Sequence, residues 1–245
     1  SDVYKRQLGD RVTSDAQVRI LGRMENASNH TLLIEIDGIS HVYKPISGER
    51  SLWDFPTGTL AYREVAAFEL SELLGWHIVP HTYLIDGPEG EGSVQRWVDG
   101  EVHDVELFAK SGVPDNWARI IQGVDEHGQE VVLAHNQSSE VAKLCLFDVL
   151  INNADRKGGH ILTTAEGKVF GIDHGVTFHH ENKLRTVLWG WSEQPIPTHL
   201  LQDVQACLDK LALSQLVSLI SPVELHALSE RMHSVLESKH FPAPS

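Results

Sequence analysis

Residues 138–175 read SSEVAKLCLFDVLINNADRKGGHILTTAEGKVFGIDHG, and this stretch decides the fold. Residues 138–152 predict a helix that is apolar on nearly all sides and that begins at a serine pair, whose hydroxyls can cap the free helix amides. A polar loop follows. Two short apolar segments, residues 161–164 and 169–172, then predict a hairpin closed by the turn AEGK.

Two carboxylates stand at the two ends of this predicted hairpin. Asp155 lies in the polar loop that leaves the helix, and Asp173 follows the second strand directly. Loops that leave regular elements commonly carry binding and catalytic residues, because the rigid frame holds the side chains in position. The stretch therefore predicts that Asp155 and Asp173 lie beside each other in a functional site.

The first hundred residues predict an antiparallel sheet. Alternating and apolar segments predict strands at residues 17–22, 32–36, 41–45, 79–85 and 93–98. The pair Asp37 and Gly38 predicts a tight turn between the second and third strands. A helix is expected over residues 59–74, where Gly75 stops it.

The rest of the chain is predicted to be mainly helical. Residues 99–137 are polar and irregular, with one helix expected near residues 115–121. Further helices are expected over residues 199–211, 214–220 and 221–238. The last of these begins with a capping box formed by Ser221 and Glu224.

Composition and termini restrict the class of protein. Lysine and arginine total 20 against 34 acidic residues, and the net charge of −14 argues against nucleic acid and anionic membranes as partners. No apolar run reaches the length of a membrane span and no secretory signal opens the chain, so no stable membrane insertion is expected. Cys145 and Cys207 fall in apolar helical patterns, which favours buried free thiols and a cytoplasmic location. The oligomeric state is left open.

The first seven residues are set apart from the fold. Residues 2–7 read DVYKRQ, which a common transposase sequencing adapter encodes in one reading frame. They show no packing pattern and precede the first predicted strand. We therefore interpret residues 1–7 as an assembly scar.

The order of four charged residues resembles that of kinases. Lys44 lies on the third predicted strand, Glu64 lies in the first turns of the following helix, and Asp155 and Asp173 flank the hairpin. The sequence Asp-Arg, a ligand position five residues after Asp155, and then Ile-Asp-x-Gly at Asp173 resembles the atypical branch of phosphatidylinositol 3-/4-kinase-like and HipA-like kinases. Over roughly residues 16–240, the chain is similar to a mainly actinobacterial branch described as phosphatidylinositol-kinase-like.

This resemblance implies an α+β, two-lobed protein-kinase-like fold. An antiparallel N-lobe and the hinge would occupy residues 8–98, and a mainly helical C-lobe with the catalytic and metal-binding loops would occupy residues 99–245. The cofactors implied are ATP and Mg²⁺, or Mn²⁺ in its place.

The resemblance also implies roles for residues of the N-lobe. Lys44 would hold the α- and β-phosphates of ATP, and Glu64 would pair with Lys44, with Glu69 as the alternative partner. The strand end from Gln95 to Val98 would present backbone groups to adenine. None of these residue types is rare, so the prediction depends on their order along the chain.

In the C-lobe, the resemblance places the chemistry on the loop and the hairpin. Asp155 would orient the acceptor hydroxyl, and Arg156 would either steady the γ-phosphate or pair with an acid. Asp173 would bind the metal ion. His160 stands at a metal-ligand position where most relatives have asparagine, and imidazole is a poorer ligand than oxygen for Mg²⁺.

The leading interpretation is an ATP-dependent phosphotransferase, a kinase whose acceptor is a hydroxyl on a protein, a lipid or a metabolite. The first alternative is a pseudokinase or nucleotide-binding regulatory module, which is motivated by His160 and by the absence of a glycine-rich turn in the sheet. The second is a metal-dependent hydrolase that uses Asp155, His160, Asp173 and His174.

Overall fold

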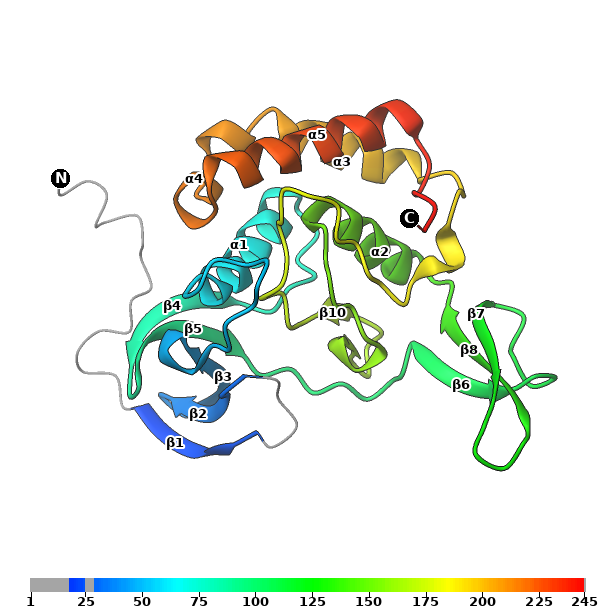
Figure 1. Ribbon diagram of the computed structural model, residues 1–245, viewed down its shortest axis with the longest axis horizontal. Helices are drawn as coiled ribbons and strands as arrows, with labels where there is room; N and C mark the ends of the chain where they lie inside the picture. The colour runs from blue at the N-terminus through cyan, green and yellow to red at the C-terminus, as the bar shows by residue number, and fades with distance from the viewer. Residues whose placement is uncertain (1–17, 25–28, 245) are drawn as a thin grey trace.

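The computed structural model describes residues 18–24 and 29–244, so the proposed scar at residues 1–7 lies outside the described part of the chain. The molecule has the expected two-lobed α+β arrangement, with an antiparallel sheet at one end and stacked helices beside it (Figure 1).

The sheet of the first lobe contains β1 (Val18–Arg23), β2 (Leu32–Ile36), β3 (Ile39–Pro45), β4 (Thr82–Gly87) and β5 (Gly90–Arg96). Their spatial order is β1-β2-β3-β5-β4, and every neighbouring pair is antiparallel. Asp37 and Gly38 both have positive φ, 48° and 82°, in the tight turn predicted between β2 and β3. The five predicted strands are present; β2 has the predicted bounds, and the other four differ from the prediction at one or both ends.

The later start of β4 has a local cause. The backbone N–H groups of Ile78 and Val79 donate to Oγ of Ser71, at 2.9 and 3.3 Å. Pro80 has no N–H group to offer to a neighbouring strand. Strand pairing therefore begins at Thr82, not at Val79 as predicted.

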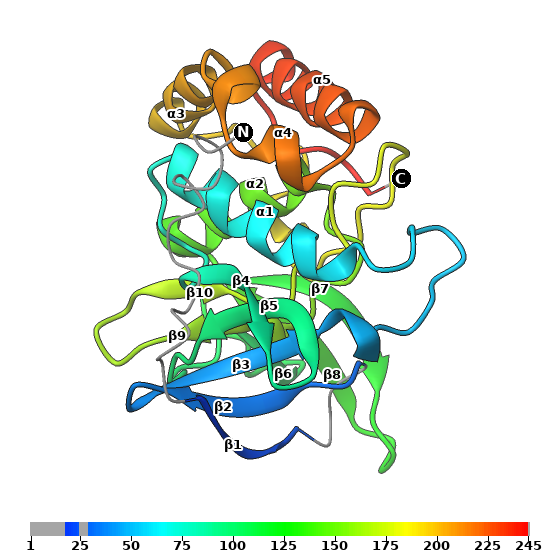
Figure 2. The same ribbon diagram turned by 90° about the vertical axis from the view of Figure 1, so that its left-hand side faces the viewer.

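The helices form two layers on one side of this sheet (Figure 2). The inner layer contains α1 (Leu60–Leu73) and α2 (Ser139–Ile151), and the outer layer contains α3 (Thr198–Leu208), α4 (Leu216–Leu219) and α5 (Pro222–Ser238). Oγ of Ser138 accepts the N–H of Val141 and caps α2, at 3.3 Å. The capping box of Ser221 and Glu224 forms at the start of α5, as predicted.

Helix α1 packs on the helical lobe with the side that carries small residues. Ala66, Ala67 and Leu70 share one buried core with α2, which is apolar on nearly all sides. The sheet has a smaller core of its own, which includes Ile34 and Tyr43. Because α1 lies between the sheet and α4 of the outer layer, a side chain on α1 can face both lobes (Figure 2).

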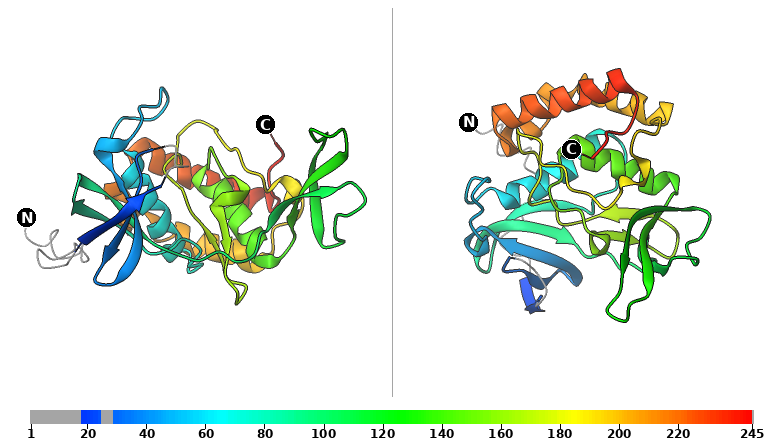
Figure 3. Two further views of the ribbon diagram at one scale, coloured as in Figure 1. Left: turned by 90° about the horizontal axis from the view of Figure 1, so that it is seen from below. Right: turned by 45° about the vertical axis from the view of Figure 1, so that its right-hand side comes forward.

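Residues 99–137 contain a second sheet, and the predicted helix near residues 115–121 is wrong. The strands are β6 (Val105–Ala109), β7 (Trp117–Val124) and β8 (Glu130–Asn136), in the order β6-β8-β7. This sheet projects from the molecule at the end away from β1–β5 (Figure 1, Figure 3). The local pattern missed it because strand stability comes from cross-strand neighbours, and β6 pairs with residues about 25 positions further along the chain.

The hairpin at the centre of the chain consists of β9 (Ile161–Thr163) and β10 (Val169–Gly171). Oγ1 of Thr163 donates to Oδ2 of buried Asp104, whose other oxygen accepts from Nδ2 of Asn136 at 3.0 Å. These contacts join the hairpin to the projecting sheet, so the loops at the end of the hairpin have a fixed position.

The remaining elements are short 3₁₀ helices: η2 (Ile46–Gly48), η3 (Gly158–His160), η4 (Trp189–Trp191) and η5 (Leu211–Leu213). Cys145 and Cys207 are free and buried, as predicted. Within residues 18–24 and 29–244, no helix combines the length and the apolar character needed to cross a membrane.

Candidate active site

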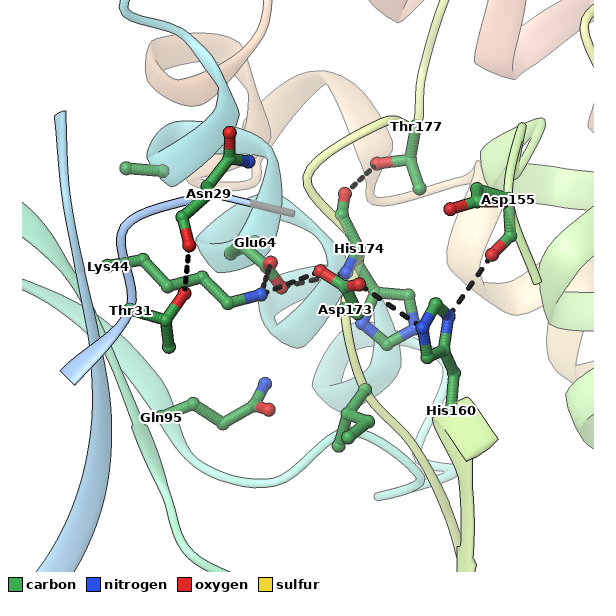
Figure 4. Close-up of polar contacts among 12 residues, drawn as sticks. Asn29, Thr31, Lys44, Glu64, Gln95, Asp155, His160, Asp173, His174 and Thr177 are labelled. Carbon is green, nitrogen blue, oxygen red and sulfur yellow. Dashed lines mark hydrogen bonds and ion pairs between the residues drawn. The ribbon is translucent and has the colours of Figure 1, made fainter. Parts of the chain in front are cut away.

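Lys44 lies at the centre of a chain of ionic contacts between the two lobes. Its Nζ contacts Oε1 of Glu64 on α1 and lies 2.8 Å from Oδ1 of Asp173, the residue two positions after β10 (Figure 4). Glu64 is therefore the partner of Lys44, and the alternative, Glu69, is not needed. The other oxygen of Glu64 accepts the backbone N–H of His174, at 2.9 Å, so α1 is also tied to the segment that carries Asp173.

The electrostatics of this cluster favour the charged forms of Lys44 and Asp173. Burial alone would lower the pKa of Lys44, but the carboxylates of Glu64 and Asp173 outweigh burial and raise it above its ordinary value. The ammonium of Lys44 holds the pKa of Asp173 well below its usual range, against the opposite effect of burial. Asp173 has φ of 60°, a left-handed conformation that a non-glycine residue adopts at some cost in free energy.

His160 faces the second oxygen of Asp173. The distance from Nε2 of His160 to Oδ2 of Asp173 is 3.3 Å, and Nδ1 of the ring lies 3.1 Å from the backbone carbonyl of Asp155 (Figure 4). Burial lowers the pKa of His160. Because a carbonyl oxygen only accepts hydrogen bonds, Nδ1 carries the hydrogen and Nε2 of the neutral ring presents a lone pair to Asp173.

Arg156 was predicted as catalytic, and the structure corrects its position. The side chain of Arg156 is fully buried and forms a forked ion pair with Asp148, at 2.9 to 3.1 Å. Nη1 donates to the carbonyls of His160 and Ile172, at 3.1 and 2.8 Å, and Nη2 also contacts Nε2 of His174 at 2.8 Å. The guanidinium thus has no donor left for a phosphate. Of the two predicted alternatives, Arg156 pairs with an acid. It also holds the backbone at His160 and at Ile172 in position.

Asp148 is the residue that the sequence interpretation missed. It is fully buried on α2, and besides Arg156 it accepts from Nδ2 of Asn153 at 2.9 Å and from Oγ1 of Thr186 at 3.0 Å. Asn153 in turn accepts the backbone N–H of Asp155, at 3.0 Å. The one charged residue in the apolar segment 144–151 of α2 was the available signal, because a buried charge requires a partner.

The metal-dependent hydrolase alternative requires His174 as a metal ligand, and the position of His174 does not suit that role. It is fully buried, and burial together with the cation of Arg156 lowers its pKa well below the ordinary value. Its Nε2 already contacts Arg156. In the part of the chain that the structure describes, no three histidine, cysteine or acidic side chains form a group able to hold a metal ion.

Two cavities meet at Lys44 and Asp173. The larger, about 690 Å³, is lined by both residues and by His160, Lys157 and the segment 95–100. Its size is typical of small-molecule sites. The smaller, about 70 Å³, is lined by Lys44 and Asp173 together with Glu64, Asp155 and Gly175. A hollow of about 1160 Å³ on the helical lobe contains none of the predicted site residues.

The predicted hinge residues differ in what they can offer to a ligand. Gln95 lies inside β5, between Val42 on β3 and Thr82 on β4, and its Nε2 donates to Oγ1 of Thr82 at 2.9 Å. Val98 follows the end of β5, and no described protein group bonds to its backbone N–H or carbonyl. Both residues line the larger cavity, but only Val98 has free backbone groups there.

Asp155 lies in the wall of the smaller cavity and not of the larger one. Its carboxylate is about half exposed, and Oδ2 is 2.8 Å from Nζ of Lys157, whose pKa is raised by this hydrogen bond. The predicted proximity of Asp155 and Asp173 is present, because both line the smaller cavity, but of the two only Asp173 also lines the larger one.

Comparison with known proteins assigns the family. Residues 106–238 match the family described as phosphatidylinositol 3- and 4-kinase. The chain is also similar to Protein Rv2133c of Mycobacterium tuberculosis, with 44% identity over 252 residues that cover 96% of this chain and 91% of the relative. The chain belongs to the phosphatidylinositol 3- and 4-kinase family, which confirms the resemblance seen in the sequence, and this relative agrees with the actinobacterial branch.

A solved structure confirms the fold. The crystal structure of the golgi casein kinase is similar with a TM-score of 0.55 and 14% sequence identity, and the match covers 97% of this chain and 73% of that chain. The two-lobed protein-kinase-like fold is therefore present. The Helicobacter pylori proinflammatory kinase CtkA gives a TM-score of 0.48 and 11% identity, with 93% of each chain covered.

Proposed function

We propose that the protein is an ATP-dependent phosphotransferase that transfers a phosphoryl group to a hydroxyl acceptor in the cytoplasm. The observation that carries the proposal is the position of Lys44, which contacts Glu64 and Asp173 where a large cavity and a small cavity meet. In this proposal the hinge lies at the boundary between residues 98 and 99. The large cavity takes the nucleotide, and the small cavity takes the acceptor.

Lys44 binds the α- and β-phosphates. Its ammonium is held in place by Glu64, whose side chain is almost fully buried, so little conformational freedom is lost when a phosphate arrives. Val98 binds the adenine through its free backbone N–H and carbonyl, while Gln95 contributes its side chain to the cavity wall. Trp97 has its indole N–H bonded to Asp99 at 2.7 Å, which orders the segment beside Val98.

Asp173 and His160 are the residues that hold a divalent cation, Mg²⁺ or Mn²⁺. One carboxylate oxygen and one imidazole nitrogen lie 3.3 Å apart, and a neutral ring with its hydrogen on Nδ1 leaves a lone pair on that nitrogen. This donor pair fits a cation whose other ligands come from phosphate and water, as is usual for metal–nucleotide complexes. When bound, the cation neutralises the charge that develops on the phosphates.

Asp155 receives the proton of the acceptor hydroxyl or orients that hydroxyl. It lies on the side of Lys44 and Asp173 away from the large cavity, which is where an acceptor must approach a γ-phosphate for in-line transfer. Lys157 restrains the carboxylate through the contact at 2.8 Å. Arg156 acts only through the backbone that it holds, and is a positioning residue.

Two variants test the proposal. Asp173→Asn should remove metal-dependent ATP binding, measured by calorimetry with Mg²⁺ and with Mn²⁺. Asp155→Asn should retain ATP binding and lower phosphoryl transfer by roughly 10²- to 10⁴-fold, the usual contribution of a positioned acid or base. Transfer is measured with labelled ATP on the protein itself and on protein, lipid and metabolite acceptors.

The outcomes separate the functions. A wild-type protein that binds ATP but transfers no phosphoryl group to any acceptor or to water is a nucleotide-binding module. A wild-type protein that binds no nucleotide with either cation overturns the proposal. Asp115→Asn, at an exposed position outside both cavities, gives a control for the loss of one carboxylate.

A further inference from the structure

We propose that His160 makes this a site for a first-row transition dication, such as Mn²⁺, in preference to Mg²⁺. The inference rests on the proposed function only in placing a divalent cation at Asp173. It concerns which cation the donor atoms of this chain select.

Two acceptor atoms face each other across the proposed cation position. Nδ1 of His160 lies against the carbonyl of Asp155 and takes the ring hydrogen, so Nε2 of the neutral ring is left as an acceptor, and 3.3 Å away is Oδ2 of Asp173, a carboxylate oxygen. Two acceptors at this separation repel each other unless a cation or a proton lies between them. Oδ1 of Asp173 is bonded to Lys44, so the carboxylate has only Oδ2 free for this role.

The distance between the two atoms suits a shared cation. Metal–nitrogen and metal–oxygen bonds of about 2.0–2.2 Å place two donors about 3.0 Å apart at a right angle and about 3.4 Å apart at a tetrahedral angle. The observed 3.3 Å lies in this interval. Nε2 and Oδ2 can therefore bind one cation without a large movement of either side chain.

The imidazole is held in this orientation. The side chain of His160 is 16% exposed, and its backbone carbonyl accepts from Nη1 of Arg156 at 3.1 Å. Its backbone carbonyl also accepts the N–H of Ile172, at 3.0 Å, one residue before Asp173. Rotation of the ring away from Asp173 would break the Nδ1 contact with Asp155, so the nitrogen stays in the ligand position.

The chemistry of the donors then decides the preference. Mg²⁺ binds oxygen ligands in a nearly ideal octahedron, whereas imidazole nitrogen suits first-row transition ions better. An amide oxygen at position 160 would offer Mg²⁺ the ligand it prefers. With imidazole at this position, the protein offers the cation one nitrogen ligand and one carboxylate oxygen ligand, and no amide oxygen.

The first experiment detects the metal–nitrogen bond in the wild-type protein. Protein labelled with ¹⁵N in histidine is loaded with Mn²⁺ and a non-hydrolysable ATP analogue, and electron spin-echo envelope modulation is recorded. We expect a ¹⁵N coupling to Mn²⁺ that is absent in His160→Asn and retained in His127→Asn, where the exposed histidine of a remote turn is changed. Absence of the coupling in wild type, or of any Mn²⁺ binding, overturns the inference.

The second experiment measures the preference itself. Mg²⁺ displaces Mn²⁺ from the protein–analogue complex, and the free Mn²⁺ signal reports the ratio of the two affinities. His160→Asn should lower the preference for Mn²⁺ over Mg²⁺ by at least about tenfold, while His127→Asn leaves it unchanged. An equal ratio in wild type and His160→Asn contradicts the inference.

The two proposals can fail separately. Phosphoryl transfer with Mg²⁺ and no histidine coupling to Mn²⁺ would support the proposed function and overturn the metal preference. Histidine-coupled Mn²⁺ without phosphoryl transfer would support the preference and overturn the function. A thermal melt establishes that His160→Asn is folded, and the coupling in wild type does not depend on that variant.

Discussion

Nζ of Lys44 lies 2.8 Å from Oδ1 of Asp173, although the two residues are 129 positions apart in the chain. Lys44 belongs to the central strands of the sheet lobe, and Asp173 follows the hairpin of the helical lobe. The contact therefore joins the lobes at the meeting point of the two cavities. A nucleotide phosphate that enters the large cavity must share the ammonium with Asp173.

Lys44→Ala should weaken ATP binding about 10- to 100-fold, because hydrogen bonds to charged groups contribute about 1.5–3 kcal/mol. Isothermal titration calorimetry with metal and ATP measures the change. Lys110→Ala is the control, since Lys110 forms an exposed ion pair with Glu130 on the projecting sheet. Unchanged ATP affinity and turnover in Lys44→Ala would show that Lys44 does not bind the phosphates of ATP.

Glu64→Gln and Glu69→Gln compare two glutamates of one helix. Glu64 contacts Lys44 and the N–H of His174, so its neutralisation should release the ammonium and lower the rate of phosphoryl transfer about tenfold or more. Glu69 takes no part in this contact, so Glu69→Gln should keep wild-type kinetics. Steady-state assays at saturating and limiting ATP measure both. Equal losses in the two variants would show that the helix, not the ion pair, matters.

Arg156→Met should lower the free energy of unfolding by about 3–5 kcal/mol, because it leaves the fully buried carboxylate of Asp148 without its partner. Lys110→Met breaks an exposed pair and should cost about 0–1 kcal/mol. Guanidinium unfolding followed by circular dichroism measures both values. If Arg156→Met unfolds at the wild-type midpoint, the buried pair contributes little to stability.

His174 should make the folded state sensitive to mild acid. Burial and the nearby cation of Arg156 lower the pKa of His174, so as the pH falls below about 6.5 the unfolded chain binds a proton that the folded chain does not. The free energy of unfolding should therefore fall by about 1.4 kcal/mol between pH 7.5 and 5.5 from this group alone. His174→Gln should lose that part of the decrease, whereas His127→Gln, at an exposed position, should keep it. Denaturant unfolding at both pH values measures the difference, and an unchanged decrease in His174→Gln would assign it to other groups.

The second sheet shows where local patterns are insufficient. A helix was predicted near residues 115–121, yet Trp117–Val124 forms β7 and pairs with β8. A strand is stabilised by neighbours that the local sequence does not contain. Strands β2 and β3 were predicted because a two-residue turn with Asp37 and Gly38 makes their pairing local.

The buried charges show a second limit. The sequence placed Arg156 next to Asp155 and allowed it either a phosphate or an acid as partner. The partner, Asp148, lies in the last turn of α2, where its neighbours in the sequence are apolar. Which charge a buried arginine meets depends on how the loop folds back on the helix, and this is a property of the packed structure.

The sequence by itself determined the helix, the hairpin and the order of Lys44, Glu64, Asp155 and Asp173, because helix and strand periods and short turns are local properties. Only the tertiary structure decided that Glu64 and not Glu69 meets Lys44, and that Asp155 lines the small cavity alone whereas Asp173 lines both cavities. These outcomes depend on the relative position of α1, the sheet and the hairpin. That position is set by packing between residues more than a hundred positions apart, which no local pattern encodes.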